Sequence, residues 1–249
     1  MPSSAPWAPP SVRVRADPGF EEDARTLATR LGLAFGLVPA RYELRVGAGG
    51  VALVSEQAPS DRAAALRVDL SARRSGQVPV VRAVTGGRPR DRVGRVVDAT
   101  AGLGADAAAL ARAGLEVVMI ERHPVIGALL ADGLARLEAA EPGAVALSLR
   151  VGDARELLAT LAPPPQVVFL DPMHPRRRGG AKRASAAWLR DLSGPPDEAE
   201  QRALLARARA VARRRVVVKR PAKSAPLEPG WSGRIEGRTV RFDLYAPDR

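Results

Sequence analysis

The stretch Val96-Val97-Asp98-Ala99-Thr100-Ala101-Gly102-Leu103-Gly104-Ala105-Asp106 decides the fold of this chain. It predicts a short buried strand that ends on an acid, then a turn with two glycines, then the first turn of a helix. Glycine adopts positive φ at no steric cost and lets a ligand approach the backbone closely. The stretch therefore indicates a nucleoside-binding turn at the carboxyl end of a parallel strand.

The acids around this turn narrow the choice of ligand. Residues 102–107, Gly-Leu-Gly-Ala-Asp-Ala, formally fit the dinucleotide fingerprint, whose third glycine position tolerates alanine. A pyrophosphate placed there would lie close to the carboxylates of Asp98 and Asp106, which is unfavourable. S-adenosylmethionine has no phosphate and carries a sulfonium and an ammonium, so it suits the acids. We therefore expect Asp98, Gly102 and Gly104 to contact S-adenosylmethionine, with a nicotinamide dinucleotide as the alternative.

Strands and helices alternate on the carboxyl side of this turn, which predicts a doubly covered parallel sheet. The expected fold class is α/β, a class I Rossmann-like sheet over residues 89–249, with a small α+β extension over residues 1–88. Further strands are expected at 116–120, 145–151, 167–170, 216–218 and 241–245, and helices at 124–137, 157–161 and 202–214. In the extension we expect a helix over 20–31, a hairpin over 42–54, a strand at 68–70 and a basic loop at 73–76.

The composition of the chain limits the metals, membranes and partners with which it can interact. The 249 residues include no cysteine and two histidines, which excludes disulfides, thiolate nucleophiles and cysteine-ligated zinc, so we expect no metal. We find neither a signal-peptide pattern nor a membrane-length apolar stretch, so we expect a cytoplasmic protein without membrane contact. The net charge of +12 suggests a polyanionic partner such as RNA, although an arginine-rich composition explains it equally well.

Acids recur where the expected strands end, at Asp98, Glu121, Asp153 and Asp171. Ligands of open α/β sheets bind outside those ends. Glu121 lies close to the spacing at which an acid meets ribose hydroxyls, and the alternative is a surface pair with Arg122. Asp153 suits the exocyclic amine of adenine, and it can at the same time cap the following helix.

The segment Asp171-Pro172-Met173-His174-Pro175 predicts the reacting centre. The lone pair of an exocyclic base amine is delocalised into the ring, so fixed hydrogen-bond acceptors favour its attack on an electrophile. The Asp171 carboxylate and the Pro172 carbonyl can serve as those acceptors for a base extruded from its stack. His174 can stack on that base, or it can be a solvated loop residue.

Basic residues follow this segment and recur on a later strand. A basic, glycine-interrupted loop beside the reacting centre suits RNA phosphates, although it can equally be a solvated loop. We expect phosphate contacts from Arg176, Arg177, Arg178, Lys182, Arg183, Lys219 and Arg220.

Five segments together resemble the RsmJ-type methyltransferases, which modify the exocyclic amine of a guanine in small-subunit ribosomal RNA. They are DATAGLGADA (98–107), ERHPVIGALLADGLARL (121–137), VVFLDPMHP (167–175), RRRVVVKRP (213–221) and RFDLYAP (241–247). The chain departs from the family at Ala105, where the family has an arginine, and at His174, where it has an aromatic residue. The resemblance implies cofactor contacts at Ala105, Asp106, Glu121, Arg122, Asp153, Ala154 and Asp171.

The resemblance also implies an activity and a partner. The activity is S-adenosylmethionine-dependent methylation of the N2 amine of one guanine in 16S ribosomal RNA, with naked RNA or the small ribosomal subunit as partner. Two alternatives remain at this point: a nicotinamide-dependent oxidoreductase, and a non-catalytic RNA-binding module that keeps the fold.

Overall fold

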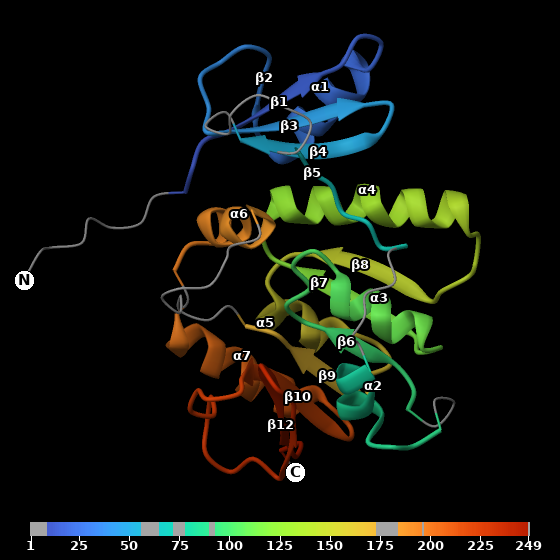
Figure 1. Cartoon of the computed structure of the whole chain (residues 1–249), viewed down its shortest axis with the longest axis vertical. Helices are drawn as coiled ribbons and strands as arrows, with labels where there is room; N and C mark the ends of the chain where they lie inside the picture. Colours follow the sequence, from blue (N-terminus) through green and yellow to red (C-terminus); the bar gives the residue numbers. More distant parts are fainter. Residues whose placement is uncertain are drawn as a thin grey trace, which may run out of the picture.

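The structure contains two sheets with one long helix between them (Figure 1). It is a computed structural model that describes residues 9–55, 65–71, 78–89, 93–172, 184–195 and 197–248. The smaller sheet belongs to the amino-terminal part of the chain and the larger one to the rest. The expected α/β architecture with a smaller amino-terminal extension is confirmed.

The large sheet has the order β11-β12-β10-β9-β6-β7-β8 in the described part of the chain. Strands β10, β9, β6, β7 and β8 are parallel neighbours, whereas β12 and β11 add an antiparallel edge. The strands are β6 (Val96–Asp98), β7 (Val117–Glu121), β8 (Leu147–Val151), β9 (Val167–Leu170), β10 (Arg215–Pro221), β11 (Gly233–Glu236) and β12 (Val240–Tyr245).

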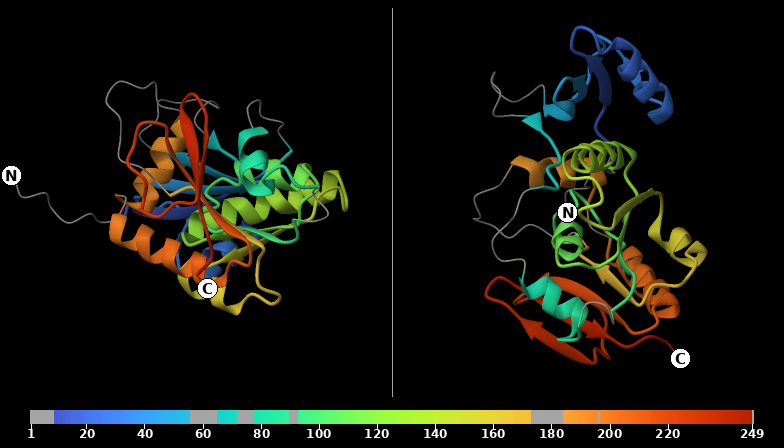
Figure 2. Two further views of the ribbon diagram at one scale, coloured as in Figure 1. Left: turned by 90° about the horizontal axis from the view of Figure 1, so that it is seen from below. Right: turned by 90° about the vertical axis from the view of Figure 1, so that its right-hand side faces the viewer.

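Helices cover both faces of the large sheet (Figure 2). Successive side chains of a strand point to opposite faces, and each face here is apolar. In β9, for example, Phe169 belongs to the core beneath α3 and α4, whereas Val168 belongs to the core beneath α7. The helices are α2 (Val78–Thr85), α3 (Ala105–Arg112), α4 (Pro124–Ala140), α5 (Ala154–Leu157) with a 3-10 turn (Leu158–Thr160), α6 (Ala184–Ser193) and α7 (Glu198–Val211).

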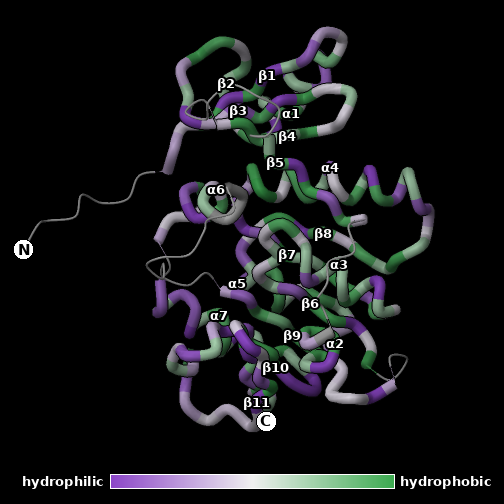
Figure 3. Tube along the Cα trace, viewed as in Figure 1, coloured by the Kyte–Doolittle hydropathy of each residue, from purple (hydrophilic) through white to green (hydrophobic). Residues whose placement is uncertain are grey.

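Hydropathy along the chain follows this layering (Figure 3). The central strands β6, β7 and β9 are hydrophobic up to the acids at or after their ends, because helices bury both of their faces. The chain runs outward from β6 through β7 to β8, and then returns to place β9 on the other side of β6. That reversal of strand order beside β6 is where a sheet of this kind opens a crevice for ligands.

The smaller sheet has the order β2-β1-β3-β4-β5 and packs beneath helix α1 (Glu21–Leu31). Its strands are β1 (Val12–Ala16), β2 (Ala34–Phe35), β3 (Tyr42–Gly47), β4 (Gly50–Ser55) and β5 (Ala65–Leu66). The expected helix and the β3–β4 hairpin are confirmed. One hydrophobic core runs from this sheet through α4 into the large sheet, so the two parts of the chain are packed as one body.

The expected strand at residues 68–70 is wrong. Val68 and Leu70 are buried, but their carbonyls accept side-chain hydrogen bonds from Arg136 (2.6 Å) and Arg112 (3.0 Å) instead of joining a ladder. Val68 packs so closely on α4 that a Cβ at Gly133 would lie 2.6 Å from its Cγ1. The apolar alternation therefore reflects a segment buried against a helix. The expected basic loop at 73–76 lies outside the described residues.

Helix α2 belongs spatially to the large sheet although we placed it in the extension. Arg214 donates to the Thr85 carbonyl, and Arg215 donates to that of Ala83. We therefore propose that the extension ends after β5 and not at residue 88. Helix α7 begins four residues earlier than expected, because Asp197 accepts from the backbone N–H groups of residues 199 and 200 and so caps it.

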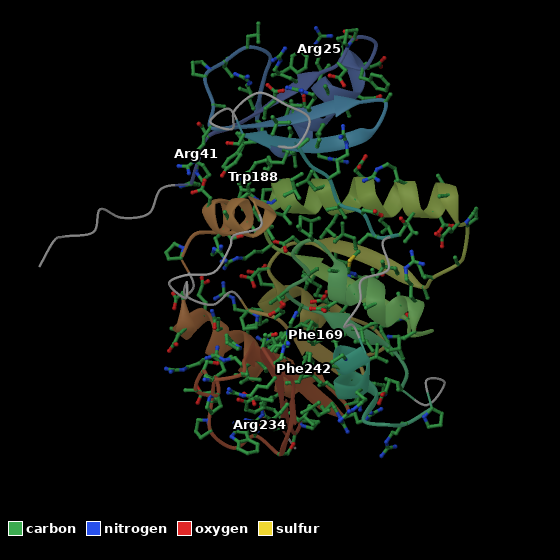
Figure 4. All side chains as sticks on the ribbon, in the orientation of Figure 1. Arg25, Arg41, Phe169, Trp188, Arg234 and Phe242 are labelled. Atoms are coloured by element: carbon green, nitrogen blue, oxygen red, sulfur yellow. The ribbon has the colours of Figure 1, made fainter. Side chains whose placement is uncertain are left out.

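Helix α6 joins the extension to the rest of the molecule. Trp188, labelled in Figure 4 beside Arg41, lies against Tyr42 with ring centroids 5.8 Å apart. Asp191 accepts from the Tyr42 hydroxyl at 2.7 Å. Asp191 also pairs with Arg41 at 2.9 Å. Among the helices that the structure describes, none is long and apolar enough to cross a membrane.

Candidate active site

The four acids that follow the parallel strands lie at one edge of the large sheet. Asp98 ends β6, Glu121 ends β7, Asp153 follows β8 and Asp171 follows β9. Their common edge is set by the strands, because parallel neighbours end on the same side. The structure thus brings together the acids on which the sequence prediction rested.

The glycine turn is held by packing at one glycine and left open at the other. Gly104 has φ +74°, and a Cβ there would lie 2.8 Å from Leu70 Cδ2 and 2.9 Å from Leu130 Cδ2. Gly102 has φ +54°, and a Cβ there would meet only the Thr100 carbonyl, at 4.0 Å, among the described atoms. Gly104 therefore seats the turn on the core, whereas Gly102 keeps its outer side open.

Glu121 ties this turn to the next strand. Its Oε2 accepts from the backbone N–H of Gly102 at 2.9 Å, and its Oε1 accepts from that of His123 at 2.8 Å. Burial raises the pKa of Glu121, while these two donors oppose the rise. Each carboxylate oxygen has a second lone pair, so the same group can accept two further hydrogen bonds from a bound diol.

A lysine that we expected to face RNA phosphates lies inside the site instead. Lys219 Nζ is 2.6 Å from Asp106 Oδ2 and 2.8 Å from Asp171 Oδ2, and its side chain is 21% exposed. Arg220, also expected at the rim, is 6% exposed and donates to the Ala225 carbonyl at 3.0 Å. Both side chains thus make contacts within the molecule, Lys219 with two acids and Arg220 with a backbone carbonyl, and their expected contacts with RNA phosphates stay predictions.

The charge balance of the site favours a cationic ligand. Asp98 is 2% exposed, and burial together with nearby Asp106 and Asp171 raises its pKa well above the usual carboxyl range. Burial also raises the pKa of Asp171, against the opposing effect of Lys219. Among the residues that the structure describes here, three carboxyl groups thus lie near one lysine, so a cationic ligand would add favourable charge.

Thr100 links the glycine turn to the reacting segment. Its hydroxyl oxygen accepts from the backbone N–H of Asp171 at 2.6 Å, and its own backbone N–H donates to Asp98 Oδ1 at 3.2 Å. Sequence reasoning missed this residue. The sequence did offer one sign of its role, since its hydroxyl lies two residues after the acid that ends β6, inside the glycine-turn segment.

The remaining predicted cofactor residues lie at the outer part of the edge. Asp153 caps α5 through the Arg155 N–H at 2.8 Å and pairs with the Arg155 guanidinium, which holds its pKa below the usual value. Ala154 is buried beside it and Ala105 begins α3. Arg122 pairs with Glu200 on α7 at 2.7 Å and is half exposed. The alternative for Glu121, a surface pair with Arg122, is not what the structure has, because Glu121 is buried and Arg122 pairs with α7.

Several predicted residues lie outside the described part of the chain. They are His174, Arg176, Arg177, Arg178, Lys182 and Arg183, whereas Asp171 and Pro172 are described. In the described residues, no group of three or more histidine or acidic side chains could hold a metal ion.

These residues fit S-adenosylmethionine. The carboxylates of Asp98, Asp106 and Asp171 suit its positive charges, and Glu121 suits its ribose hydroxyls. His123 adds a fitting group that the sequence did not assign, because its Nδ1 is buried without a hydrogen-bond partner among the described residues.

Known methyltransferases are similar to this chain in sequence. A family model described as a putative SAM-dependent methyltransferase matches residues 42–247. The ribosomal RNA small subunit methyltransferase J of Pseudomonas fluorescens is 40% identical over 95% of this chain and 96% of its own length. That of Alkalilimnicola ehrlichii is 42% identical over 93% of this chain and 94% of its own length. The chain belongs to this methyltransferase family.

The structural comparison agrees with that assignment. The crystal structure of a SAM-dependent methyltransferase from Neisseria gonorrhoeae matches this methyltransferase with a TM-score of 0.74 and 28% identity, over 94% of this chain and 96% of that chain. The expected class I fold and the cofactor S-adenosylmethionine are confirmed. Family membership thereby decides against the nicotinamide-dependent alternative that the glycine turn alone left open.

Replacing Asp98 with Asn is expected to flatten the dependence of stability on pH. Because the pKa of Asp98 is raised on folding, the folded chain binds this proton more tightly than the unfolded chain. The free energy of unfolding then falls as pH rises from the usual carboxyl range through the raised pKa. Asn cannot ionise, so the cofactor-free variant should be more stable than the wild type near neutral pH.

Urea unfolding of both proteins across that pH range measures the effect, with Asp248→Asn at an exposed carboxylate as control. Calorimetry with S-adenosylhomocysteine should show weaker binding to Asp98→Asn. Parallel stability curves for the wild type and Asp98→Asn would contradict this account of the buried acid.

Proposed function

We propose that this methyltransferase methylates the exocyclic N2 amine of one guanine in 16S ribosomal RNA, and that it does so in the cytoplasm. The observation that carries the proposal is the carboxylate of Asp171, held at the end of β9 beside the acids and the glycine turn of the cofactor site. The names of the relatives support small-subunit ribosomal RNA as the substrate.

The acceptors at the end of β9 suit an amine substrate. The Asp171 carboxylate and the Pro172 carbonyl accept the two hydrogens of the guanine amine and turn its nitrogen toward the methyl donor. S-adenosylmethionine supplies an electrophilic methyl group on its sulfonium. The new N–C bond would form as the bond between sulfur and the methyl carbon breaks, with S-adenosylhomocysteine as the leaving group. The nitrogen would lose one proton, which the Asp171 carboxylate is placed to accept. The rate then depends on positioning and fixed charges, without a covalent enzyme intermediate.

The cofactor is held by the residues of the glycine turn and the neighbouring strand ends. In this proposal Asp98, Asp106 and the open side of Gly102 surround the methionine part. Glu121 and His123 bind the ribose, and Asp153 with Ala154 lies at the adenine. Ala105 contributes through its backbone, since it has no polar side chain where the family has an arginine.

Methyl transfer to RNA tests this function directly. We would incubate the protein with labelled S-adenosylmethionine and either naked 16S ribosomal RNA or small subunits from cells that lack the protein. Nuclease mapping by mass spectrometry then locates the modified base. A methyl group on guanine N2 supports the proposal. Binding of RNA without any transfer would favour a non-catalytic RNA-binding module, and a methyl group on another base would overturn the assignment to guanine.

The basic segment after Asp171 is proposed to bind RNA phosphates. Replacing Arg176, Arg177 and Arg178 together with Ala should weaken RNA binding and flatten its dependence on salt. The slope of log affinity against log salt should change by somewhat under 1 for each phosphate that the variant no longer neutralises. Filter binding across a salt series measures this slope, with Arg207→Ala on the exposed side of α7 as control. Cofactor affinity should not change, and an unaltered salt slope would assign these arginines to solvent.

A further inference from the structure

We propose that Lys219 is a positioning residue for methyl transfer, because its ammonium bridges Asp171 at the reacting centre to Asp106 behind the glycine turn. The inference rests on the proposed role of Asp171 and deepens it. It gives Lys219 a task different from the phosphate contact that its sequence position suggested.

The bridge connects elements that are far apart in the chain. Strand β10 pairs in parallel with β9, with Val218 opposite Leu170, so the next residues along the two chains are Lys219, still in β10, and Asp171, just past the end of β9. Asp106 is the second residue of α3, immediately after Gly104 and Ala105. One side chain thus fixes the amine acceptor relative to the segment that holds the cofactor.

The environment of Lys219 keeps it charged and in place. Burial alone would lower its pKa, but the carboxylates of Asp171 and Asp106 outweigh burial and raise it. A partly buried cation with two carboxylate partners at 2.6 and 2.8 Å is costly to move toward solvent, because both partners would lose their counter-charge. Lys219 is therefore poorly suited to leave the site for an RNA phosphate.

The contact also orients the acceptor. Lys219 binds Oδ2 of Asp171, and Oδ1 has no hydrogen bond to the other described residues, so it can accept from the guanine amine. Within the described ranges, the charged groups that face Asp171 are Lys219 on β10, Asp106 on α3 and Asp98 on β6. Of these, Lys219 is the one that favours the ionised carboxylate, which is the form that accepts a hydrogen bond.

Four proteins test this role: wild type, Lys219→Met, Lys219→Arg, and the exposed Lys223→Met as a control of the same residue type. Carboxyl-carbon NMR of the cofactor-free proteins, assigned with Asp171→Asn, measures the pKa of Asp171. Single-turnover methylation with saturating cofactor and RNA, measured against pH, gives the acid limb of the rate. Thermal unfolding and S-adenosylhomocysteine binding check that each variant is folded.

We expect Lys219→Met to raise the pKa of Asp171, to move the acid limb of the rate to higher pH, and to slow transfer at neutral pH by at least about tenfold. Lys219→Arg should restore the acid limb because it keeps the positive charge, and Lys223→Met should match the wild type. The salt slope of RNA binding should not change in Lys219→Met.

Three outcomes would overturn the inference. An Asp171 pKa and acid limb that do not move in Lys219→Met would reject the coupling. A reduced salt slope with normal single-turnover rates would return Lys219 to the RNA phosphates. Normal activity of Asp171→Asn would remove the premise that Asp171 acts on the guanine amine. If Asp171→Asn is slow but Lys219→Met is normal, the proposed function stands and only the role of Lys219 is rejected.

Discussion

Asp171→Asn is expected to keep RNA binding but, with RNA and cofactor both saturating, to methylate at least on the order of 10²-fold more slowly in a single turnover, the scale for losing one preorganised electrostatic group. The structure explains why this small change should be severe. The Lys219 ammonium lies 2.8 Å from Oδ2 of Asp171 and can only donate, so an Asn there would turn its amide oxygen toward the lysine. Its NH2 group would then face the hydrogens of the guanine amine.

The measurement is quenched single-turnover transfer with saturating RNA and S-adenosylmethionine. Asp153→Asn serves as the matched control, because it makes the same change at another acid of this edge that caps α5. The control should act mainly through cofactor affinity, so saturation should restore its rate. A near-normal saturated rate for Asp171→Asn would show that the carboxylate does not act on the amine.

The sequence predicted the strand ends well because each was marked twice, by a buried apolar run and by the acid that follows it. Asp98, Glu121 and Asp171 lie at one edge for that reason. The predicted strand at residues 68–70 is wrong because alternating apolar and polar residues indicate that one face of a segment is buried, but not which element buries it. Val68 is buried by α4, and its carbonyl is satisfied by Arg136 instead of a strand.

The position of Lys219 could not be predicted from its sequence neighbours. Adjacent basic residues at 219 and 220 look like one surface patch, yet the two side chains point to opposite faces of β10 and meet different partners. Lys219 meets the carboxylates of Asp106 and Asp171, more than 100 and nearly 50 residues away in the chain. Only the strand order, which places β10 beside β9, makes that contact apparent.

Glu121→Ala is expected to weaken binding of S-adenosylmethionine by about 1.5–3 kcal/mol, the range for hydrogen bonds to a charged group, which corresponds to roughly 10- to 150-fold in affinity. Part of the loss comes from the ribose hydroxyls. Part comes from the turn itself, because the N–H groups of Gly102 and His123 lose their acceptor. The buried donors left behind should also lower the free energy of unfolding.

Glu121→Gln separates these two contributions, as one amide oxygen can still accept from one of the two backbone N–H groups while the charge is lost. In calorimetry with S-adenosylhomocysteine, the affinity of Glu121→Gln should lie between those of the wild type and Glu121→Ala. In urea unfolding, its free energy of unfolding should also lie between theirs. The ribose offers a further control, since 2′-deoxyadenosyl and adenosyl ligands should differ in affinity for the wild type and hardly at all for Glu121→Ala. If the two ligands bind the wild type equally well, Glu121 holds the turn without touching the ribose, and the loss of affinity in Glu121→Ala is structural.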